Sequence, residues 1–174
     1  MLAVSGLSIL LAISSVTARP ADDIIFACDV GANRVEVIRE GRELVYRFGA
    51  PGGPALRVVG DPAAGTLSNA SMPMPIGEAR ILRFRAGVRS YIVYHVFDLE
   101  PGGDARMRLD QGGVLVLEGD REVERLACRM GDWRNLDDDP LDGQFSDVTM
   151  LETFPRDPQP LYERVLRVAA SGGK

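Results

Sequence analysis

The chain has 174 residues and a formal net charge of −5; 45% of its residues are hydrophobic and 26% are charged. Such values are typical of a globular domain, and the negative charge argues against nonspecific binding to nucleic acid. Lys174 is the only lysine, so chemistry that needs a lysine, such as a Schiff base, is excluded from the body of the chain.

Residues 1–18 carry no charge, are almost wholly apolar and end in small residues. This pattern predicts a secretory signal peptide cleaved after Ala18. The stretch is too short for a transmembrane helix, which needs about 20 apolar residues. We therefore expect a periplasmic or secreted protein with no stable membrane insertion after cleavage. The alternative is that residues 1–18 form a hydrophobic first strand or helix of the fold.

The chain after residue 18 is typical of short strands separated by glycine-rich turns. A first strand is expected at 24–29. Residues 34–39 then alternate with period two, which places Val35 and Val37 on one face. The next expected elements are a turn at 40–42, a strand at 43–48, a Gly/Pro loop at 49–54 and a strand at 56–59.

Residues 66–77 contain Met72-Pro73-Met74-Pro75 and predict an irregular loop or an edge strand, because proline cannot donate to a β ladder. A strand at 79–85 follows. Residues 90–97 are apolar on both faces, so this strand should be central and covered on both sides.

The last predicted strands form a hairpin. A loop tip at 100–104 and a short strand at 106–109 precede strands at 113–118 and 121–128, which are joined by Gly119-Asp120, a two-residue turn. Apolar residues with helical spacing at 160–170 predict a C-terminal helix, either packed on the sheet or loose.

The predicted fold class is all-β. About eight antiparallel strands without a βαβ rhythm indicate a barrel or sandwich with a short C-terminal helix. We expect a signal peptide at 1–18, a β-domain at 19–150 and a C-terminal extension at 151–174.

Cys28 and Cys128 are the two cysteines, one near each end of the strand-rich region. In an exported protein an even pair predicts a disulfide, and the alternative is two separate buried thiols. A metal or redox role is disfavoured, because there is no Cys-x-x-Cys motif and only one histidine.

The sequence predicts no catalytic residue. His95 lies within a predicted strand, where a structural hydrogen bond is the expected role. None of Ser68, Ser71 and Ser90 lies in the strained glycine-flanked turn of a hydrolase nucleophile.

We also expect no metal and no cofactor. The acidic residues between 137 and 147 do not match the spacing of a calcium-binding EF-hand, so a solvated loop is expected there. No glycine-rich phosphate-binding motif is present.

One basic concentration stands out on the predicted strand at 79–85 and just after it. Arg83 and Arg85 should share a strand face beside Tyr91 and Tyr94. Arginine forks bind carboxylates and phosphates, so an exposed face of this kind could hold an acidic partner. The alternative is a solvated outer face with glutamate neighbours. The residues considered for this concentration are Arg80, Arg83, Arg85 and Arg89, with Arg47 or Arg106 beside them.

The segment Phe26 to Gly31, aromatic-Ala-Cys-Asp-x-Gly followed by a Val-x-Val strand, resembles the start of the membrane-bound or periplasmic inhibitors of C-type lysozyme. Those proteins are small exported bacterial β-barrels with a cysteine in the first strand tied to one near the end of the barrel. Arg89-Ser90-Tyr91 and Gly103-Asp104-Ala105 loosely match two motifs of the family, with Gly102 where the second motif has a lysine.

The resemblance implies a noncatalytic exported domain that binds a protein partner in the cell envelope, with a lysozyme-type cell-wall hydrolase as the expected target. An arginine would reach into the acidic cleft of that target. Two other classes stay open: a small-ligand-binding or structural envelope protein, and a carbohydrate-active hydrolase that uses Asp or Glu. The candidate partner-binding residues are Ser90, Tyr91, Asp104 and Arg106.

Overall fold

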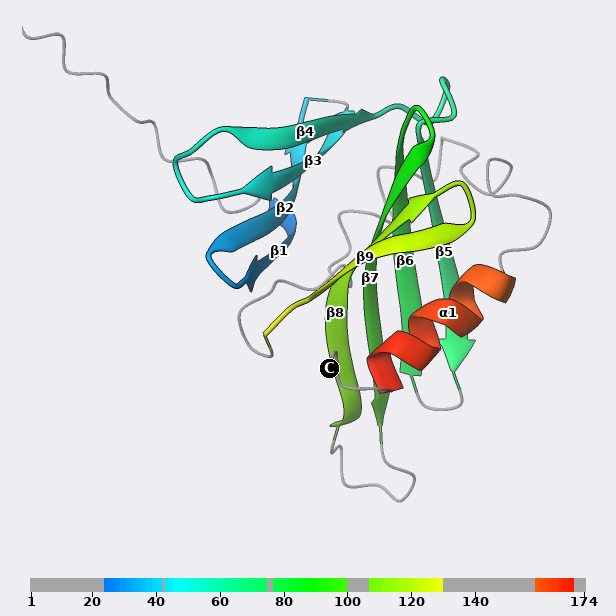
Figure 1. The fold of residues 1–174 in the computed structure, drawn as a ribbon. Coiled ribbons are helices and arrows are strands. Elements are labelled where there is room, and N and C mark those ends of the chain that lie inside the picture. The colour runs from blue at the N-terminus through cyan, green and yellow to red at the C-terminus, as the bar shows by residue number, and fades with distance from the viewer. Residues whose placement is uncertain (1–23, 42, 75–76, 100–106, 130–158, 171–174) are drawn as a thin grey trace, which may run out of the picture.

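The computed structural model describes residues 24–41, 43–74, 77–99, 107–129 and 159–170. Within these ranges, nine strands form two antiparallel sheets that pack against each other, and a helix lies on the second sheet (Figure 1). The predicted all-β class with a C-terminal helix is confirmed, and of the two architectures expected the sandwich is the one found.

The first sheet is a series of hairpins with strand order β1-β2-β3-β4. Gly31 and Gly41 lie in the first two turns with φ angles of 60° and 63°, a region that side chains other than glycine rarely adopt. Val35 and Val37 are both buried on one face of the second strand, as their spacing predicts. The strands are β1 Ile24–Val30, β2 Asn33–Glu40, β3 Glu43–Gly49 and β4 Ala55–Gly60.

The second sheet has strand order β5-β6-β7-β8-β9, again with each strand next to its neighbour in the chain. Its middle strand is buried on both faces, as the apolar run at 90–97 predicts. The strands are β5 Leu67–Met74, β6 Gly77–Ala86, β7 Arg89–Leu99, β8 Met107–Glu118 and β9 Arg121–Ala127.

Of the two alternatives expected for residues 66–77, the edge strand is the one found: most of this region is β5, and an edge tolerates Pro73 because one side of the strand makes no ladder bonds. One other prediction differs from the structure. The separate strands expected at 106–109 and 113–118 belong to one strand, β8. Gly112 and Gly113 do not interrupt it, because they stand opposite His95 and Tyr94 and continue the ladder.

The main core fills the space between the sheets. Its centre is aromatic: the ring of Tyr46 from β3 stacks on Tyr91 from β7, with centroids 5.0 Å apart, and lies 5.9 Å from Phe84 of β6. All three side chains are buried. Such pairs add about 1 kcal/mol each to the effect of burying the rings, so they fix how β3 sits over β6 and β7.

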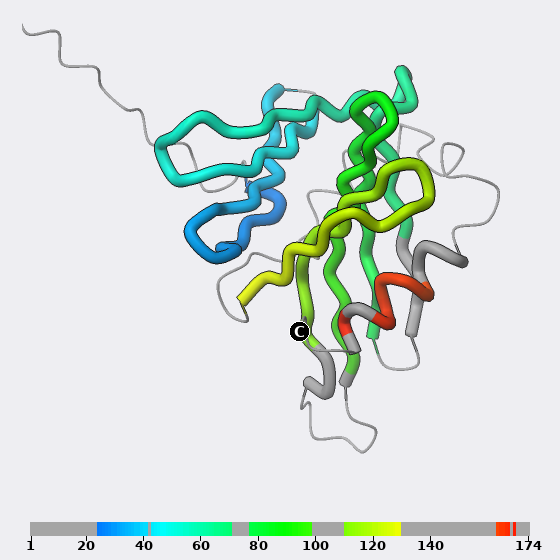
Figure 2. The backbone as a smooth tube through the Cα atoms, in the orientation of Figure 1, coloured from blue at the N-terminus to red at the C-terminus, as the bar shows by residue number. Residues whose placement is uncertain are grey.

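A second core lies on the outer face of the second sheet, under helix α1, Gln159–Ala170. Figure 2 shows the helix running across this face. Val165 and Ala169 are fully buried there against a cluster that includes Ile81, Ile92 and Leu115. The helix is therefore packed on the sheet and not loose.

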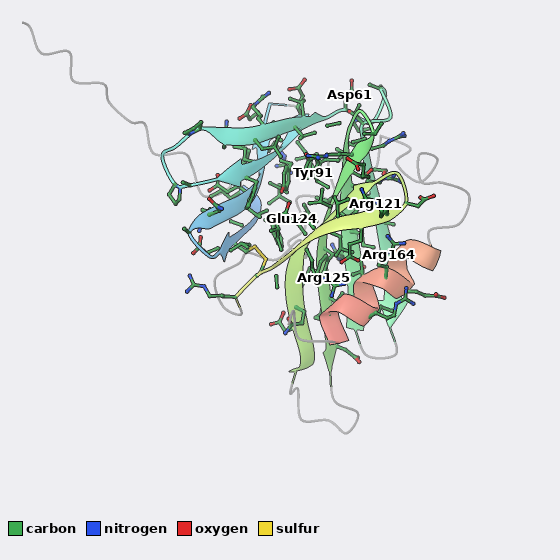
Figure 3. All side chains as sticks on the ribbon, viewed as in Figure 1. Asp61, Tyr91, Arg121, Glu124, Arg125 and Arg164 are labelled. Atoms are coloured by element: carbon green, nitrogen blue, oxygen red, sulfur yellow. A yellow bond between two sulfur atoms is a disulfide. The ribbon has the colours of Figure 1, made fainter. Side chains whose placement is uncertain are left out.

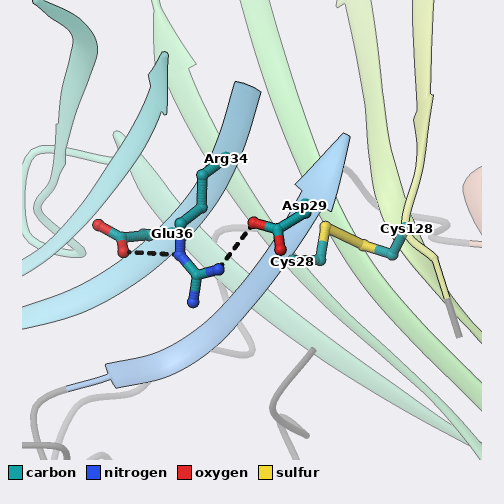
Figure 4. A network of polar contacts seen from close by, with 5 residues as sticks. All are labelled: Cys28, Asp29, Arg34, Glu36 and Cys128. Carbon is teal, nitrogen blue, oxygen red and sulfur yellow. Dashed lines mark hydrogen bonds and ion pairs between the residues drawn. A yellow bond between two sulfur atoms is a disulfide. The ribbon is translucent and has the colours of Figure 1, made fainter. Parts of the chain in front are cut away.

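The predicted disulfide is present and joins the two sheets. Cys28 lies in β1 and Cys128 directly follows β9, with their Cα atoms 5.4 Å apart and 100 positions apart in the sequence (Figure 4). The chain itself passes from one sheet to the other between β4 and β5. The bridge thus holds the sandwich together at the opposite edge.

Loss of this bridge should lower the free energy of unfolding by about 2–5 kcal/mol, because the unfolded chain regains the freedom of a long loop. Urea unfolding with and without reductant measures the change. The double variant Cys28→Ala/Cys128→Ala is the control: it should not respond to reductant, since the chain has no other cysteine. Identical midpoints for the oxidised and reduced wild-type protein would contradict this role.

Gly113 should tolerate no side chain. A Cβ there would come within 2.6 Å of both the Leu126 carbonyl oxygen and the Tyr94 hydroxyl. We expect Gly113→Ala to lose about 1–3 kcal/mol of stability, measured by thermal and urea unfolding. Gly53→Ala is a matched control, because its nearest contact is an ordinary 3.4 Å. Equal stability of the two variants would contradict the close packing of Tyr94 across β8.

Candidate functional site

The predicted partner-binding residues do not form a single surface within the described part of the chain. Ser90 and Tyr91 are neighbours on β7, so their side chains point to opposite faces of the sheet. Ser90 is 3% exposed on the outer face, and Tyr91 is 6% exposed in the main core. Neither side chain is offered to a partner in this structure. Asp104 and Arg106 lie outside the described residues, and a partner-binding role for all four stays a prediction.

The arginines predicted to act together are divided between surfaces. Arg83 and Arg85 do share a face of β6, the outer one, because Phe84 between them points into the main core. Arg80 lies on the other face and pairs with Glu78 at 2.9 Å. Arg47, expected beside them, is on the first sheet and pairs with Glu40 at 2.8 Å, so that expectation was wrong.

His95 makes the structural contact that was expected of it. Its Nε2 atom lies 3.1 Å from Asp110 Oδ1, and its ring lies 5.6 Å from the ring of Phe97 on the same strand. The pair joins β7 to β8. Among the residues that the structure describes, no group of three or more His, Cys, Asp or Glu side chains could hold a metal ion. The acidic residues between 137 and 147 lie outside those residues.

Arg34 is a partly buried arginine whose guanidinium is paired with carboxylates. Its Nη1 and Nε atoms donate to Asp29 at 2.7 Å and to Glu36 at 3.0 Å (Figure 4). Burial by itself would lower the pKa of Arg34, but the bonds and charges of Asp29 and Glu36 outweigh it and raise that pKa. Two carboxylates therefore pair with this charge.

Arg83 is treated differently. It is partly buried, and its Nε atom donates to the neutral Ser90 Oγ at 3.1 Å. Across the described ranges, no carboxylate pairs with it and no acceptor lies against its two Nη atoms. Burial lowers the pKa of Arg83 and the like charge of Arg85 lowers it further, while Asp120 acts weakly in the opposite direction. The guanidinium is thus a partly desolvated charge with no counterion.

This arginine belongs to a larger basic region, which we call the basic end of the second sheet. Two turns meet there, since the Gly119 amide donates to the Val88 carbonyl at 3.0 Å. Figure 3 shows Arg121 and Arg164 at this end, where β9 passes the helix. The loop that contains Asp61 also lies there, because Thr66 bonds both the Asp61 carbonyl and the Arg85 amide. The charged members are Asp61, Arg83, Arg85, Arg89, Glu118, Asp120, Arg121 and Arg164.

Five arginines and three carboxylates give the basic end a formal charge of +2, on a chain whose net charge is −5. Arg89 and Arg121 both contact the single carboxylate of Glu118, at 3.5 Å and 2.8 Å. Arg164 donates to the backbone oxygen of Asp120 at 2.9 Å, which is again a neutral acceptor. This arrangement can bind an anionic group on a partner.

The arginine concentration at 80–89 was the sequence signal for this site, and it located Arg83, Arg85 and Arg89. It could not locate Arg164, which the packing of α1 brings to the β8–β9 turn from 44 positions along the chain. Ser68 was considered only as a nucleophile, yet it stands directly opposite Arg83 in the ladder. Both contacts depend on tertiary structure, so no local sequence pattern predicts them.

No protein-family model, no curated protein and no solved structure matches this chain. No helix among the described residues is long and apolar enough to cross a membrane.

A separate feature of the main core concerns Tyr46. Its hydroxyl is buried and has no hydrogen-bond partner within the described ranges. Burial raises the pKa of Tyr46 far above its ordinary value, and the nearby Tyr91 and Glu124 add to that rise. The hydroxyl therefore stays protonated and contributes an unsatisfied polar group to an apolar core.

Tyr46→Phe should be as stable as the wild type or more stable by about 1 kcal/mol, because it removes only the unpaired hydroxyl. Tyr46→Leu, which also removes the stacked ring, should lose about 2 kcal/mol or more. Urea unfolding of the three proteins makes the comparison. A marked loss of stability in Tyr46→Phe would mean that the hydroxyl has a partner, such as a bound water.

Proposed function

We propose that this chain is an exported, noncatalytic β-sandwich domain that binds an acidic protein partner in the cell envelope through the basic end of its second sheet. The observation that carries the proposal is Arg83, a partly buried guanidinium without a counterion. A partly buried charge without a counterion lowers the stability of the fold, and binding of an anion would recover that free energy.

Three further features support a binding role. The basic end stands on two tight hairpins of a disulfide-linked sandwich, so its arginines are held by rigid elements. Its charge is opposite in sign to that of the whole chain, which favours oriented encounter with an acidic surface. The disulfide agrees with an oxidising compartment, as expected for a periplasmic or secreted protein.

The resemblance of the first strands to inhibitors of C-type lysozyme makes a cell-wall hydrolase the first partner to test. The acidic cleft of such an enzyme has the charge that the basic end would attract. In this proposal the arginine that reaches the target comes from the basic end, because Ser90 and Tyr91 are buried.

The test is an inhibition assay with purified mature protein and a panel of C-, G- and I-type lysozymes, read as the rate of cell-wall lysis. Inhibition should weaken at least tenfold in Arg85→Glu, because the reversed charge repels an acidic surface, and should fall as salt is added. Arg57→Glu is the matched control, since Arg57 is an exposed arginine on the first sheet.

The proposal predicts that Arg57→Glu inhibits as well as the wild type. Equal loss in both variants would exclude the basic end as the binding surface. If none of the lysozymes is inhibited at a micromolar excess of the protein, a cell-wall hydrolase is excluded as the partner. In that case a crosslinker installed beside Arg85 should still capture an envelope protein that the Arg85→Glu variant does not capture. If no protein shows this difference, the binding function itself is overturned.

A further inference from the structure

We infer that Arg83, together with Ser68, Ser90 and Arg85, forms a receptor for one carboxylate side chain of the partner. The inference rests on the proposed function and deepens it, since it names the group that the basic end recognises. It assigns binding to one specific residue, in place of a general attraction between charged surfaces.

The four residues lie together on the outer face of three adjacent strands. Ser68 of β5 is the ladder partner of Arg83, and Ser90 of β7 is the ladder partner of Arg85. All four side chains point to the same face, because Leu67, Phe84 and Tyr91 next to them point into the main core.

Two of these residues are buried hydroxyls. Ser68 is 4% exposed and Ser90 is 3% exposed. The Ser90 Oγ atom accepts the Nε–H of Arg83, which fixes the plane of the guanidinium. The Ser68 hydroxyl makes no side-chain hydrogen bond to any of the described residues. It stands opposite Arg83 in the ladder, beside a charge that no carboxylate among the described residues compensates.

The Nη atoms of Arg83 supply the fork that a carboxylate requires. With Nε engaged by Ser90, both terminal nitrogens keep their N–H groups for two parallel hydrogen bonds to one carboxylate. Ser68 could donate a third bond, and the exposed Arg85 adds a second positive charge on the same face of β6.

The local charge selects a monoanion. The charged groups that act on Arg83 are Arg85 and Asp120, so the three together carry +1. One carboxylate neutralises that charge, whereas a phosphate group with a charge of about −1.5 to −2 exceeds it and would have to draw on the other arginines of the basic end. A glutamate or aspartate side chain on the partner is therefore the best match.

The experiment titrates the full mature protein with hexaglutamate and, separately, with inorganic phosphate, using calorimetry at low ionic strength. Arg83→Gln should weaken hexaglutamate binding about tenfold or more, and Arg83→Lys should not restore it, because an ammonium keeps the charge but lacks the fork. Ser68→Ala should weaken binding about threefold to tenfold through loss of one hydrogen bond.

Arg121→Gln is the matched control. It removes the same charge from the same end of the sheet, but Arg121 is 72% exposed and already pairs with Glu118. Its effect on hexaglutamate binding should stay within about twofold. If the Arg83 variants fail to fold, Ser68→Ala still tests the receptor, since it changes only one small side chain.

Equal weakening in Arg83→Gln and Arg121→Gln, or full affinity in Arg83→Lys, would overturn the receptor and leave the proposed function intact as binding by overall charge. Tighter binding of phosphate than of hexaglutamate would replace the carboxylate by a phosphoryl group. No binding of either probe would overturn the receptor, and the lysozyme and crosslinking tests would then decide the proposed function separately.

Discussion

The bridge between Cys28 and Cys128 closes a sandwich that would otherwise be linked at one edge. Each sheet is a run of hairpins, so among the nine described strands each pairs only with its neighbours in the chain, and no ladder joins the two sheets. The crossing from β4 to β5 connects them on one side, and the disulfide connects β1 to the end of β9 on the other. The aromatic core of Tyr46, Phe84 and Tyr91 is held between these two links. Because the inner face is occupied by this core, any binding to the second sheet must use its outer face or its ends.

The outer face of the second sheet changes from apolar to basic along the strands. On β6 the buried Ala79 and Ile81 belong to the cluster that α1 covers, and Arg83 and Arg85 follow at the next outward positions. On β7 the same face goes from the buried Ile92 to Ser90. The boundary matters because desolvation depends on what surrounds a charge. Arg83 is close enough to the apolar cluster to be partly desolvated, and Arg85 beyond it is exposed.

Local patterns predicted much of this architecture but could not assign its surfaces. Period-two spacing identified Val35 and Val37 as core residues, Gly119-Asp120 marked a turn, and the doubly apolar run at 90–97 marked the central strand. For Leu67–Met74 the sequence left a loop and an edge strand both open, because its prolines and small residues fit either, and the structure shows the edge strand. Spacing could place Arg83 and Arg85 on one face. It could not show which face the helix covers or that Ser90 and Tyr91 are buried, because both depend on contacts between distant segments.

Folding alone gives no reason for a guanidinium at position 83. Its outward-facing neighbours Ile81 and Ile92 are apolar and buried, and a side chain of that kind at position 83 would avoid the desolvation of a charge. The partly buried Arg34 and Arg80 each pair with carboxylates, so the chain has the means to neutralise such charges and does so elsewhere. At Arg83 the same chain supplies only a hydroxyl and places a second arginine nearby. An unbalanced charge on a rigid sheet has little opportunity to relax, so its free energy falls most when an external anion fills the fork. In the proposed function, recognition of an anion accounts for this unpaired charge.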